Sequence, residues 1–401
     1  MTKRNSILLP CVMFFSVALF SCGKKGGNDT PAPVVPAIKI DDASQPRTTT
    51  AGVMHFELTL DKTTSVPVSV DYTLVDGTAK SPADYTNASG TVTFPANQSR
   101  AQLDVQIKGD PNDTRQNNID FTVQLSNPKS ATLQVNSARG TIITENGTNI
   151  TTDNTGYTTP TSYPGYTLAW SDEFSGNSVD LNSWNYESGN NNGWGNNELE
   201  YYTSSTKNSF VSNGNLVIEA RKEPINGFNY SSARMTTQNK KQFTFGRIDI
   251  RAKLPVSKGM WPALWMLGSN INTVGWPASG EIDIMELIGV SPNRVYGTMH
   301  WKNTGGTNSN KGFQYDLNTG NFSQQFHVFS LVWTQDTLKW YVDDQLYYTG
   351  TKNDVGAANY PFNAPEFFIF NVAVGGNWPG SPDPTTTFPQ RMIVDYVRVF
   401  Q

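Results

Sequence analysis

The strongest constraint on the fold is a period-two alternation of apolar and polar residues that recurs along the chain. One run places Val66, Val68 and Val70 at alternate positions, and further runs begin near Ala101 and Ile119. Successive side chains of a strand point to opposite faces, so this alternation predicts strands with one buried face. Turn sequences such as "DGT" and "SNP" separate the runs, and no helix of three turns is predicted after about residue 170. The chain is therefore expected to be all-β.

The N-terminus has the character of an export signal. Lys3 and Arg4 precede the apolar run "ILLPCVMFFSVALF", which is short for a bilayer span. The run ends in "LFSC", which resembles the lipobox of bacterial lipoproteins, so Cys22 is the expected lipidation site. Cys11, inside the apolar run, is the only other cysteine, which leaves the processed chain without an internal disulfide. We expect an exported protein, lipid-anchored to the bacterial cell envelope at the outer membrane or cell surface.

Composition divides the rest of the chain. A tether rich in Gly, Asp and Pro follows the signal, and a stretch rich in Thr, Asn, Gly and Pro separates two strand-rich regions. The predicted division is a signal peptide at 1–21, a tether at 22–37, an antiparallel β-sandwich at 38–146, a linker at 147–164, and a large sandwich or jelly roll at 165–401.

Charge and motif content narrow the function. The chain has 30 Lys and Arg against 34 Asp and Glu without a basic block, so nucleic-acid binding is not expected. All ten Trp lie between Trp170 and Trp378, and large flat apolar faces suit stacking against sugar rings. The three His stand at 55, 300 and 327, and there is no H-E-x-x-H, G-x-S-x-G or phosphate-loop motif. Carboxylates remain as the candidate catalytic groups.

The segment "SGEIDIMELIG" carries three acids on a predicted strand. Glu281 and Asp283 share a face by parity, whereas Glu286 is out of step. One extra residue near Ile284 or Met285, forming a β-bulge, returns Glu286 to the face of the other two acids. Side chains leaning inward then favour the ~5 Å carboxyl separation of retaining glycosidases, with unequal pKa values for nucleophile and acid. A solvated acidic strand is the alternative meaning of the cluster.

Two sets of motifs resemble known families. "DGTAKSPADY", "SGTVTFPANQS" and "FTVQLSNP" resemble the Calx-beta family, an immunoglobulin-like module, although "GDPNDTRQNNIDF" lacks the glutamates common in its calcium loops. "LAWSDEFSG", "NNELEYYT", "FGRIDIRAKLP", "GMWPALWMLG", "WPASGEIDIMELIG", "GTMHW", "FFIFNVAVGGNWPG" and "VDYVRVFQ" are similar to the laminarinase branch of glycoside hydrolase family 16 over about 165–401. This second resemblance implies a jelly-roll β-sandwich with a concave substrate groove and a retaining mechanism.

The family resemblance also implies residue roles. Glu281 resembles the nucleophile, Glu286 the acid/base and Asp283 the assisting acid. The implied substrate-binding residues are Trp276, Trp261, His300, Arg247 and Asn197, whereas Trp265 and Trp333 are expected in the core. The resemblance implies no cofactor for catalysis but a structural Ca²⁺ on the convex side, held by Glu173, the carbonyl of Gly214, and Asp395.

The leading prediction is a monomeric endo-β-1,3-glucanase that cleaves laminarin-like β-glucan by double displacement. Two alternatives stay open at this point. One is a hydrolase of another β-glycan, such as mixed-linkage glucan, agar or carrageenan. The other is a non-catalytic β-glucan-binding protein, a class whose members lack the catalytic glutamates that this chain has.

Overall fold

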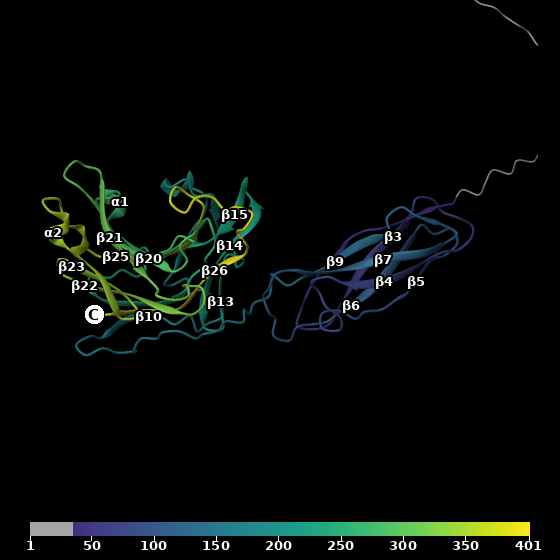
Figure 1. The fold of residues 1–401 in the computed structure, drawn as a ribbon, viewed down its shortest axis with the longest axis horizontal. Helices are drawn as coiled ribbons and strands as arrows, with labels where there is room; N and C mark the ends of the chain where they lie inside the picture. Colours follow the sequence, from purple (N-terminus) through teal and green to yellow (C-terminus); the bar gives the residue numbers. More distant parts are fainter. Residues whose placement is uncertain (1–34) are drawn as a thin grey trace, which may run out of the picture.

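The computed structural model describes residues 35–401 and consists of two β-sandwiches (Figure 1). The predicted signal at 1–21, Cys22 and most of the tether lie outside these residues. Within them, no helix has the length and apolar character needed to cross a lipid bilayer. The expected all-β class is confirmed, because the helical elements of this part are single turns: α1 (Ile271–Val274), α2 (Lys352–Val355) and the 3-10 turns Gly193–Gly195 and Pro361–Asn363.

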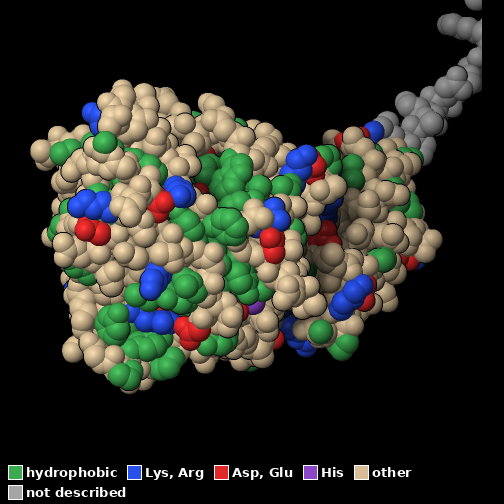
Figure 2. Space-filling view, turned by 60° about the vertical axis from the view of Figure 1, so that its left-hand side comes forward, with side chains coloured by type: hydrophobic (Ala, Val, Ile, Leu, Met, Phe, Trp, Pro, Cys, Tyr) green, Lys and Arg blue, Asp and Glu red, His purple; other side chains and the backbone are tan. Residues whose placement is uncertain are grey.

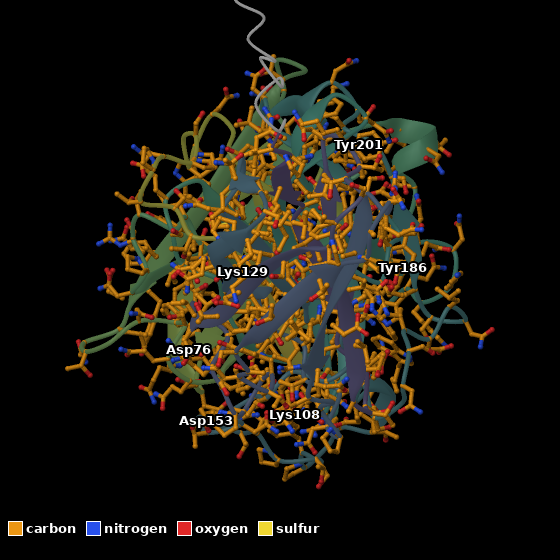
Figure 3. The ribbon with its side chains drawn as sticks, turned by 90° about the vertical axis from the view of Figure 1, so that its right-hand side faces the viewer. Asp76, Lys108, Lys129, Asp153, Tyr186 and Tyr201 are labelled. Carbon is orange, nitrogen blue, oxygen red and sulfur yellow. The ribbon has the colours of Figure 1, made fainter. Side chains whose placement is uncertain are left out.

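The smaller sandwich pairs a four-stranded sheet, in the order β6-β3-β1-β8, with a five-stranded sheet, β2-β9-β7-β4-β5. Figure 3 faces this unit, with its sheets in front of the larger domain. Tyr85 stacks on Phe121 in its core, with ring centroids 4.4 Å apart. Val66 lies before β4 and is exposed, so its assignment to a buried face was wrong. The strands are β1 (Ala37–Ile40), β2 (Ala43–Pro46), β3 (Gly52–Leu60), β4 (Val68–Asp76), β5 (Gly90–Phe94), β6 (Arg100–Ile107), β7 (Ile119–Lys129), β8 (Thr132–Leu133) and β9 (Ser137–Ile143).

The larger sandwich pairs a ten-stranded sheet with a seven-stranded sheet. The ten-stranded sheet follows the order β12-β15-β14-β26-β17-β22-β23-β24, with β10 beside β26 and β13 beside β14. Its strands are β10 (Leu168–Asp172), β12 (Glu200–Tyr202), β13 (Ser209–Ser212), β14 (Asn215–Ile225), β15 (Phe228–Ser232), β17 (Gly246–Lys253), β22 (His327–Thr334), β23 (Thr337–Val342), β24 (Gln345–Thr351) and β26 (Gln390–Phe400).

The seven-stranded sheet carries the predicted catalytic strand near its centre, in the order β11-β16-β25-β18-β19-β20-β21. Its strands are β11 (Asn185–Glu187), β16 (Arg234–Thr236), β18 (Met260–Gly268), β19 (Glu281–Glu286), β20 (Arg294–Lys302), β21 (Asn308–Asp316) and β25 (Glu366–Val374). Apolar side chains from both sheets fill the space between them, and the largest fully buried ones include Trp184, Trp333 and Trp340. The expected jelly-roll β-sandwich with two packed layers is therefore confirmed.

The segment predicted as a linker lies against the ten-stranded sheet. The backbone N–H of Ile150 donates to Ser212 Oγ at 2.7 Å, and Gly156 pairs with Phe326. Further along, the Thr159 N–H donates to the Tyr396 hydroxyl at 3.0 Å. Because backbone groups of the segment are bonded to the larger domain, it joins the two sandwiches as a fixed strap.

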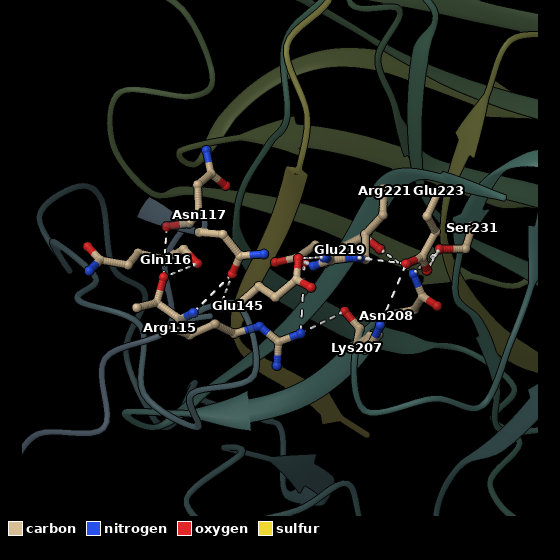
Figure 4. Close-up of polar contacts among 12 residues, drawn as sticks. Arg115, Gln116, Asn117, Glu145, Lys207, Asn208, Glu219, Arg221, Glu223 and Ser231 are labelled. Atoms are coloured by element: carbon tan, nitrogen blue, oxygen red, sulfur yellow. Dashed lines mark hydrogen bonds and ion pairs between the residues drawn. The ribbon is translucent and has the colours of Figure 1, made fainter. Parts of the chain in front are cut away.

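An ionic network joins the two sandwiches beside this strap (Figure 4). Arg115 of the smaller sandwich is buried and donates to the carbonyls of Thr206 and Lys207 at 3.3 and 3.1 Å. Arg221 of the larger sandwich bonds Glu145 of the smaller one. These contacts join the smaller sandwich to β14, a strand of the ten-stranded sheet, and to the segment that precedes β13.

Candidate active site

The catalytic strand β19 contains the predicted bulge. On β20, Thr298 pairs with Asp283 and Tyr296 with Glu286, so two steps on β20 face three steps on β19. The register against β18 shifts at the same place, where Leu264 faces Met285 but the next residue faces Asp283. An extra residue in one strand turns the following side chain to the other face. The bulge between Asp283 and Glu286 is therefore confirmed.

The bulge brings the three acids into one groove with a cavity volume of about 640 Å³. Glu281, Asp283 and Glu286 all line it, and so do the predicted binding residues Trp261, Trp276 and His300. The remaining lining residues are Trp194, Gly195, Asn196, Glu198, Arg234, Ala263, Trp265, Leu267, Thr298, Asn308, Asn310, Asn371, Ala373 and Trp378. The face drawn in Figure 2 shows Lys, Arg, Asp and Glu scattered among uncharged side chains rather than gathered by sign.

Glu281 and Glu286 each accept a hydrogen bond from one tryptophan. Trp276 Nε1 donates to Glu281 Oε2 at 2.9 Å, and Trp261 Nε1 donates to Glu286 Oε1 at 3.0 Å. An indole N–H is a donor only, so each contact fixes a carboxyl oxygen that acts as acceptor. The two aromatic rings therefore orient the acids as well as lining the groove.

His300 supplies the positive charge nearest to the acids. Its Nε2 lies 3.2 Å from Asp283 Oδ2 and 3.7 Å from Glu281 Oε1. Burial lowers the pKa of His300, but its contact with Asp283 and the charges of Asp283, Glu281 and Glu286 outweigh burial and raise the pKa to about 9. The imidazole is therefore a cation at neutral pH and stabilises ionised carboxylates beside it.

The two glutamates differ in acidity. Burial and then the charge of Asp283 raise the pKa of Glu281 to about 7, with His300 and the Trp276 N–H opposing the rise. For Glu286, burial and Asp283 raise the pKa well above its ordinary value. An ionised carboxylate and a protonated carboxyl can therefore coexist in the groove, which is the pairing that glycoside hydrolysis needs.

Arg234 lines the groove but was not among the predicted site residues. Its guanidinium lies between the rings of Trp194 and Trp265, 4.6 and 4.8 Å from their centroids, and bonds Glu187. Trp378, also missed, lies edge-on to Trp261 with centroids 5.6 Å apart. Arg234 belongs to another strand and carries no local signal in the sequence.

Trp265 was wrongly expected in the core. It lies on the groove side of β18, where Trp261, Ala263, Trp265 and Leu267 alternate along the lining, and its Nε1 donates to Asn371 Oδ1 at 2.8 Å. Trp333, expected in the core with it, is fully buried there. Parity with Trp261 was the signal that could have placed Trp265 correctly.

Two predicted binding residues do not line the groove. Arg247 lies on β17 of the ten-stranded sheet, where it bonds Asp249 at 2.8 Å and also Asp344, so its substrate role was wrong. Asn197 is exposed and donates to Asn377 Oδ1 at 2.8 Å, beside lining residues but not among them. The error at Arg247 arises because motif proximity in sequence does not say which sheet a side chain faces, whereas the substrate role of Asn197, in a loop beside the groove, stays a prediction.

The predicted calcium ligands are engaged by arginines. Glu173 accepts two bonds from Arg398, at 2.8 and 2.7 Å, and Asp395 accepts one from Arg251 at 2.7 Å. Gly214 forms the turn between β13 and β14. Ca²⁺ takes six to eight oxygen ligands, so an ion here would have to draw both acids away from their arginines. The donor set as it stands is that of ion pairs, and the calcium site stays a prediction.

Two protein-family models match the chain. The family model for glycosyl hydrolases family 16 matches residues 196–398, and the model for the Calx-beta domain matches residues 35–148. The chain is 42% identical over 252 residues to a beta-glucanase from Rhodothermus marinus, covering 59% of this chain and 86% of the relative. It is 41% identical over 267 residues to glucan endo-1,3-beta-glucosidase A1 from Niallia circulans, covering 61% of this chain but only 39% of that relative.

Solved structures give the same result. The catalytic domain of an endo-1,3-beta-glucanase (laminarinase) from Thermotoga petrophila is 50% identical, with a TM-score of 0.56, over 59% of this chain and 98% of that one. The laminarinase from Rhodothermus marinus is 40% identical, with a TM-score of 0.55, over 60% of this chain and 99% of that one. The chain belongs to glycosyl hydrolases family 16, with a Calx-beta domain before its catalytic domain.

Proposed function

We propose that the protein is a retaining endo-β-1,3-glucanase that acts on laminarin-like glucans. The observation that carries the proposal is the bulged strand β19, which places two glutamates of unequal acidity in one groove. The similarity to laminarinases over nearly their whole solved length supports the choice of glucan.

The geometry supports a double displacement. Ionised Glu281 attacks the anomeric carbon while protonated Glu286 gives its proton to the leaving glycosidic oxygen, which forms a covalent glycosyl-enzyme. Glu286, now a carboxylate, then takes a proton from water, and the resulting attack releases the sugar and restores Glu281. Cationic His300 lies beside both Glu281 and Asp283. When Glu281 loses its negative charge on glycosylation, His300 therefore keeps Asp283 as a partner.

The stereochemical outcome tests this mechanism. Laminarin hydrolysis followed by proton NMR should show the β-anomer first, with the α-anomer growing later by mutarotation. An α-anomer formed first would rule out double displacement. New reducing ends without rapid loss of chain length would rule out endo cleavage.

Other β-glycans remain alternatives within the same chemistry. Relatives include a keratan-sulfate endo-1,4-beta-galactosidase and an endo-1,3-1,4-beta-glycanase, at 31% and 30% identity. Among the described residues, Arg234 is the only Lys or Arg that lines the groove, and it already bonds Glu187, which disfavours sulfated chains. Product analysis on laminarin, mixed-linkage glucan, agar and carrageenan should show laminarin cleaved fastest.

A non-catalytic glucan-binding role is the alternative from another class. A relative with the printed name beta-1,3-glucan-binding protein is 38% identical over 184 residues. The presence of both glutamates in one groove favours hydrolysis, and a reducing-end assay on laminarin separates the two functions. Binding of laminarin without new reducing ends would establish the binding role.

We also propose that Cys22 carries a lipid anchor and that Glu173, the carbonyl of Gly214 and Asp395 hold a structural Ca²⁺. If Cys22 is lipidated, a palmitate analogue should label the parent protein but not Cys22→Ser. Equal labelling of the two proteins would rule out a lipid anchor at Cys22.

If calcium is bound, the Tm should be higher in calcium than in chelator, and this difference should be smaller in Asp395→Asn. Size-exclusion chromatography with light scattering should return the mass of a monomer.

A further inference from the structure

The bulge in β19 has a hydrogen-bond partner on the opposite sheet. Trp340 on β23 is fully buried, and its Nε1 donates to the backbone carbonyl of Asp283 at 2.8 Å. Asp283 is also the residue at which the pairing of β19 with both neighbouring strands becomes irregular. A bulge disrupts the ladder of backbone hydrogen bonds locally. The bond from Trp340 therefore holds the strand where its own ladder is interrupted.

Two glycines make room for the Trp340 ring. Gly297 lies on β20 opposite the bulge, and a Cβ there would come within 2.5 Å of Trp340 Cδ1. Gly350 lies on β24, and a Cβ there would stand 3.3 Å from Trp340 Cζ3. Close approach of this kind is a reason for glycine inside a strand. The indole thus fills the space that a side chain at position 297 would need.

A second bulge, on the facing sheet, accompanies this ring. Trp340 pairs with Tyr348 on β24, but the next residue of β23 pairs with Leu346, which leaves Tyr347 as the extra residue. The ring of Tyr348 packs on Trp340 with centroids 5.0 Å apart. The hydroxyl of Tyr347 also reaches the space beside Gly297, where a Cβ would collide with it. Irregular positions on both sheets thus meet around one indole.

We propose that Trp340 is a positioning residue for hydrolysis: its indole N–H holds the Asp283–Glu286 bulge in the geometry that keeps Glu286 on the face of Glu281. Trp340 does not line the groove, so it acts through the backbone of β19. This inference rests on the proposed function only for the rate effect, because the backbone geometry can be measured without substrate.

The test compares Trp340→Phe with Trp333→Phe. Phenylalanine keeps an aromatic ring but removes the N–H. Trp333 is a matched control, because it is also fully buried and its Nε1 donates at 2.7 Å to the carbonyl of Phe362, in the turn Pro361–Asn363 rather than at the bulge of β19. We expect both variants to lose similar Tm. Only Trp340→Phe should lower kcat on laminarin, by roughly 10- to 100-fold with KM within about 3-fold, because small misplacement of catalytic groups is costly.

Hydrogen exchange provides the readout without substrate. Amides of residues 284–286 should exchange at least about 10-fold faster in Trp340→Phe than in Trp333→Phe. Equal kcat and equal exchange in the two variants would overturn the inference while leaving the glucanase function intact. Inactivity of the unmodified protein on laminarin would overturn the proposed function, and exchange alone would then decide the inference.

A second variant covers the case in which Trp340→Phe does not fold. Gly297→Ala keeps the indole N–H, but its methyl group would stand 2.5 Å from Trp340 Cδ1 and 2.4 Å from the Tyr347 hydroxyl, so the indole has to shift. It should lower kcat with little change in KM and accelerate exchange at residues 284–286. Gly297→Ala with unchanged kcat and exchange would count against the proposal.

Discussion

The catalytic domain buries carboxylates in two different surroundings: Glu219 and Asp249 on the ten-stranded sheet lie against arginines, whereas the groove acids on the seven-stranded sheet do not. Glu219 on β14 is fully buried and bonds Arg221 and Arg391, the latter at 2.6 Å. Asp249 on β17 is also fully buried and bonds Arg247 at 2.8 Å. Burial of a charge costs several kcal/mol unless an opposite charge lies close. These acids therefore have the surroundings of structural ion pairs.

Within the part of the chain that the structure describes, no arginine bonds the groove acids of the seven-stranded sheet. Glu281 and Glu286 each accept one indole N–H, and His300 is the nearest cation. Burial with few partners raises the pKa of both glutamates. A pKa well above the ordinary value suits the proton donor Glu286, whereas Glu281, with a pKa of about 7, can still ionise near neutral pH as a nucleophile must. At comparable burial, the supply of arginines thus distinguishes Glu219 and Asp249 from the two groove glutamates.

The largest expected effect comes from Glu281→Gln. Loss of the nucleophile should lower kcat on laminarin by more than about 10³-fold, because double displacement then has no attacking group. The fold should be retained, since removing a poorly paired carboxylate leaves no arginine unpaired. The measurements are reducing-end kinetics and Tm. If the variant kept a tenth of the activity, the catalytic side of the comparison would fail.

Glu219→Gln should show the opposite behaviour. It leaves buried Arg221 and half-buried Arg391 without their shared carboxylate, and breaking a buried ion pair costs about 3–5 kcal/mol of unfolding free energy. Denaturant unfolding measures this loss, while kcat at a temperature where the variant is folded should stay within about 2-fold. A variant as stable as the parent, or one with the kinetics of Glu281→Gln, would contradict the distinction between the two sheets.

The sequence predicted those parts of the site that local parity controls. The three acids and the bulge between Asp283 and Glu286 follow from the alternation of β19, because a one-residue slip moves a side chain to the other face. Trp261 and Trp276 were placed in the groove through the family motifs around them. These features depend on one strand and its immediate flanks.

Features that depend on distant strands were out of reach. Arg247 was placed in the groove although β17 belongs to the other sheet, and Arg234 was missed although it lies between two groove tryptophans. Trp340 reaches the bulge from β23, 57 residues away in sequence. Sheet order and contacts across the sandwich set these positions, and periodicity along one strand does not encode them.

Replacing His300 should shift the pH dependence of kcat/KM. Catalysis needs ionised Glu281, so kcat/KM should rise as pH passes through about 7, the pKa of this carboxyl, and fall at higher pH as Glu286 loses its proton. The charge of His300 lowers the pKa of Glu281, so His300→Gln should move the rising limb to higher pH. An unshifted rising limb would show that His300 does not act electrostatically on the nucleophile.

The smallest expected effect is on stability, at a third kind of carboxyl. Glu366 at the start of β25 is fully buried, and within the described residues neither of its oxygens has a hydrogen-bond partner. Burial, followed by the charges of Glu281 and Asp283, raises its pKa well above the ordinary value. Glu366 therefore differs from both kinds of acid, because within the described residues it bonds no cation and does not line the groove.

The sign of its contribution follows from proton linkage. Above the ordinary glutamate pKa of about 4.3, the unfolded chain releases the proton that folded Glu366 keeps, so stability falls as pH rises, by at most about 1.4 kcal/mol per unit. Glu366→Gln should flatten that slope, with a gain near pH 8 and little change near pH 4. Denaturant unfolding across this range measures it, with exposed Glu57→Gln as the control. An unchanged slope would mean that Glu366 is ionised in the folded protein, so that burial without a cation does not suffice to keep an acid protonated here.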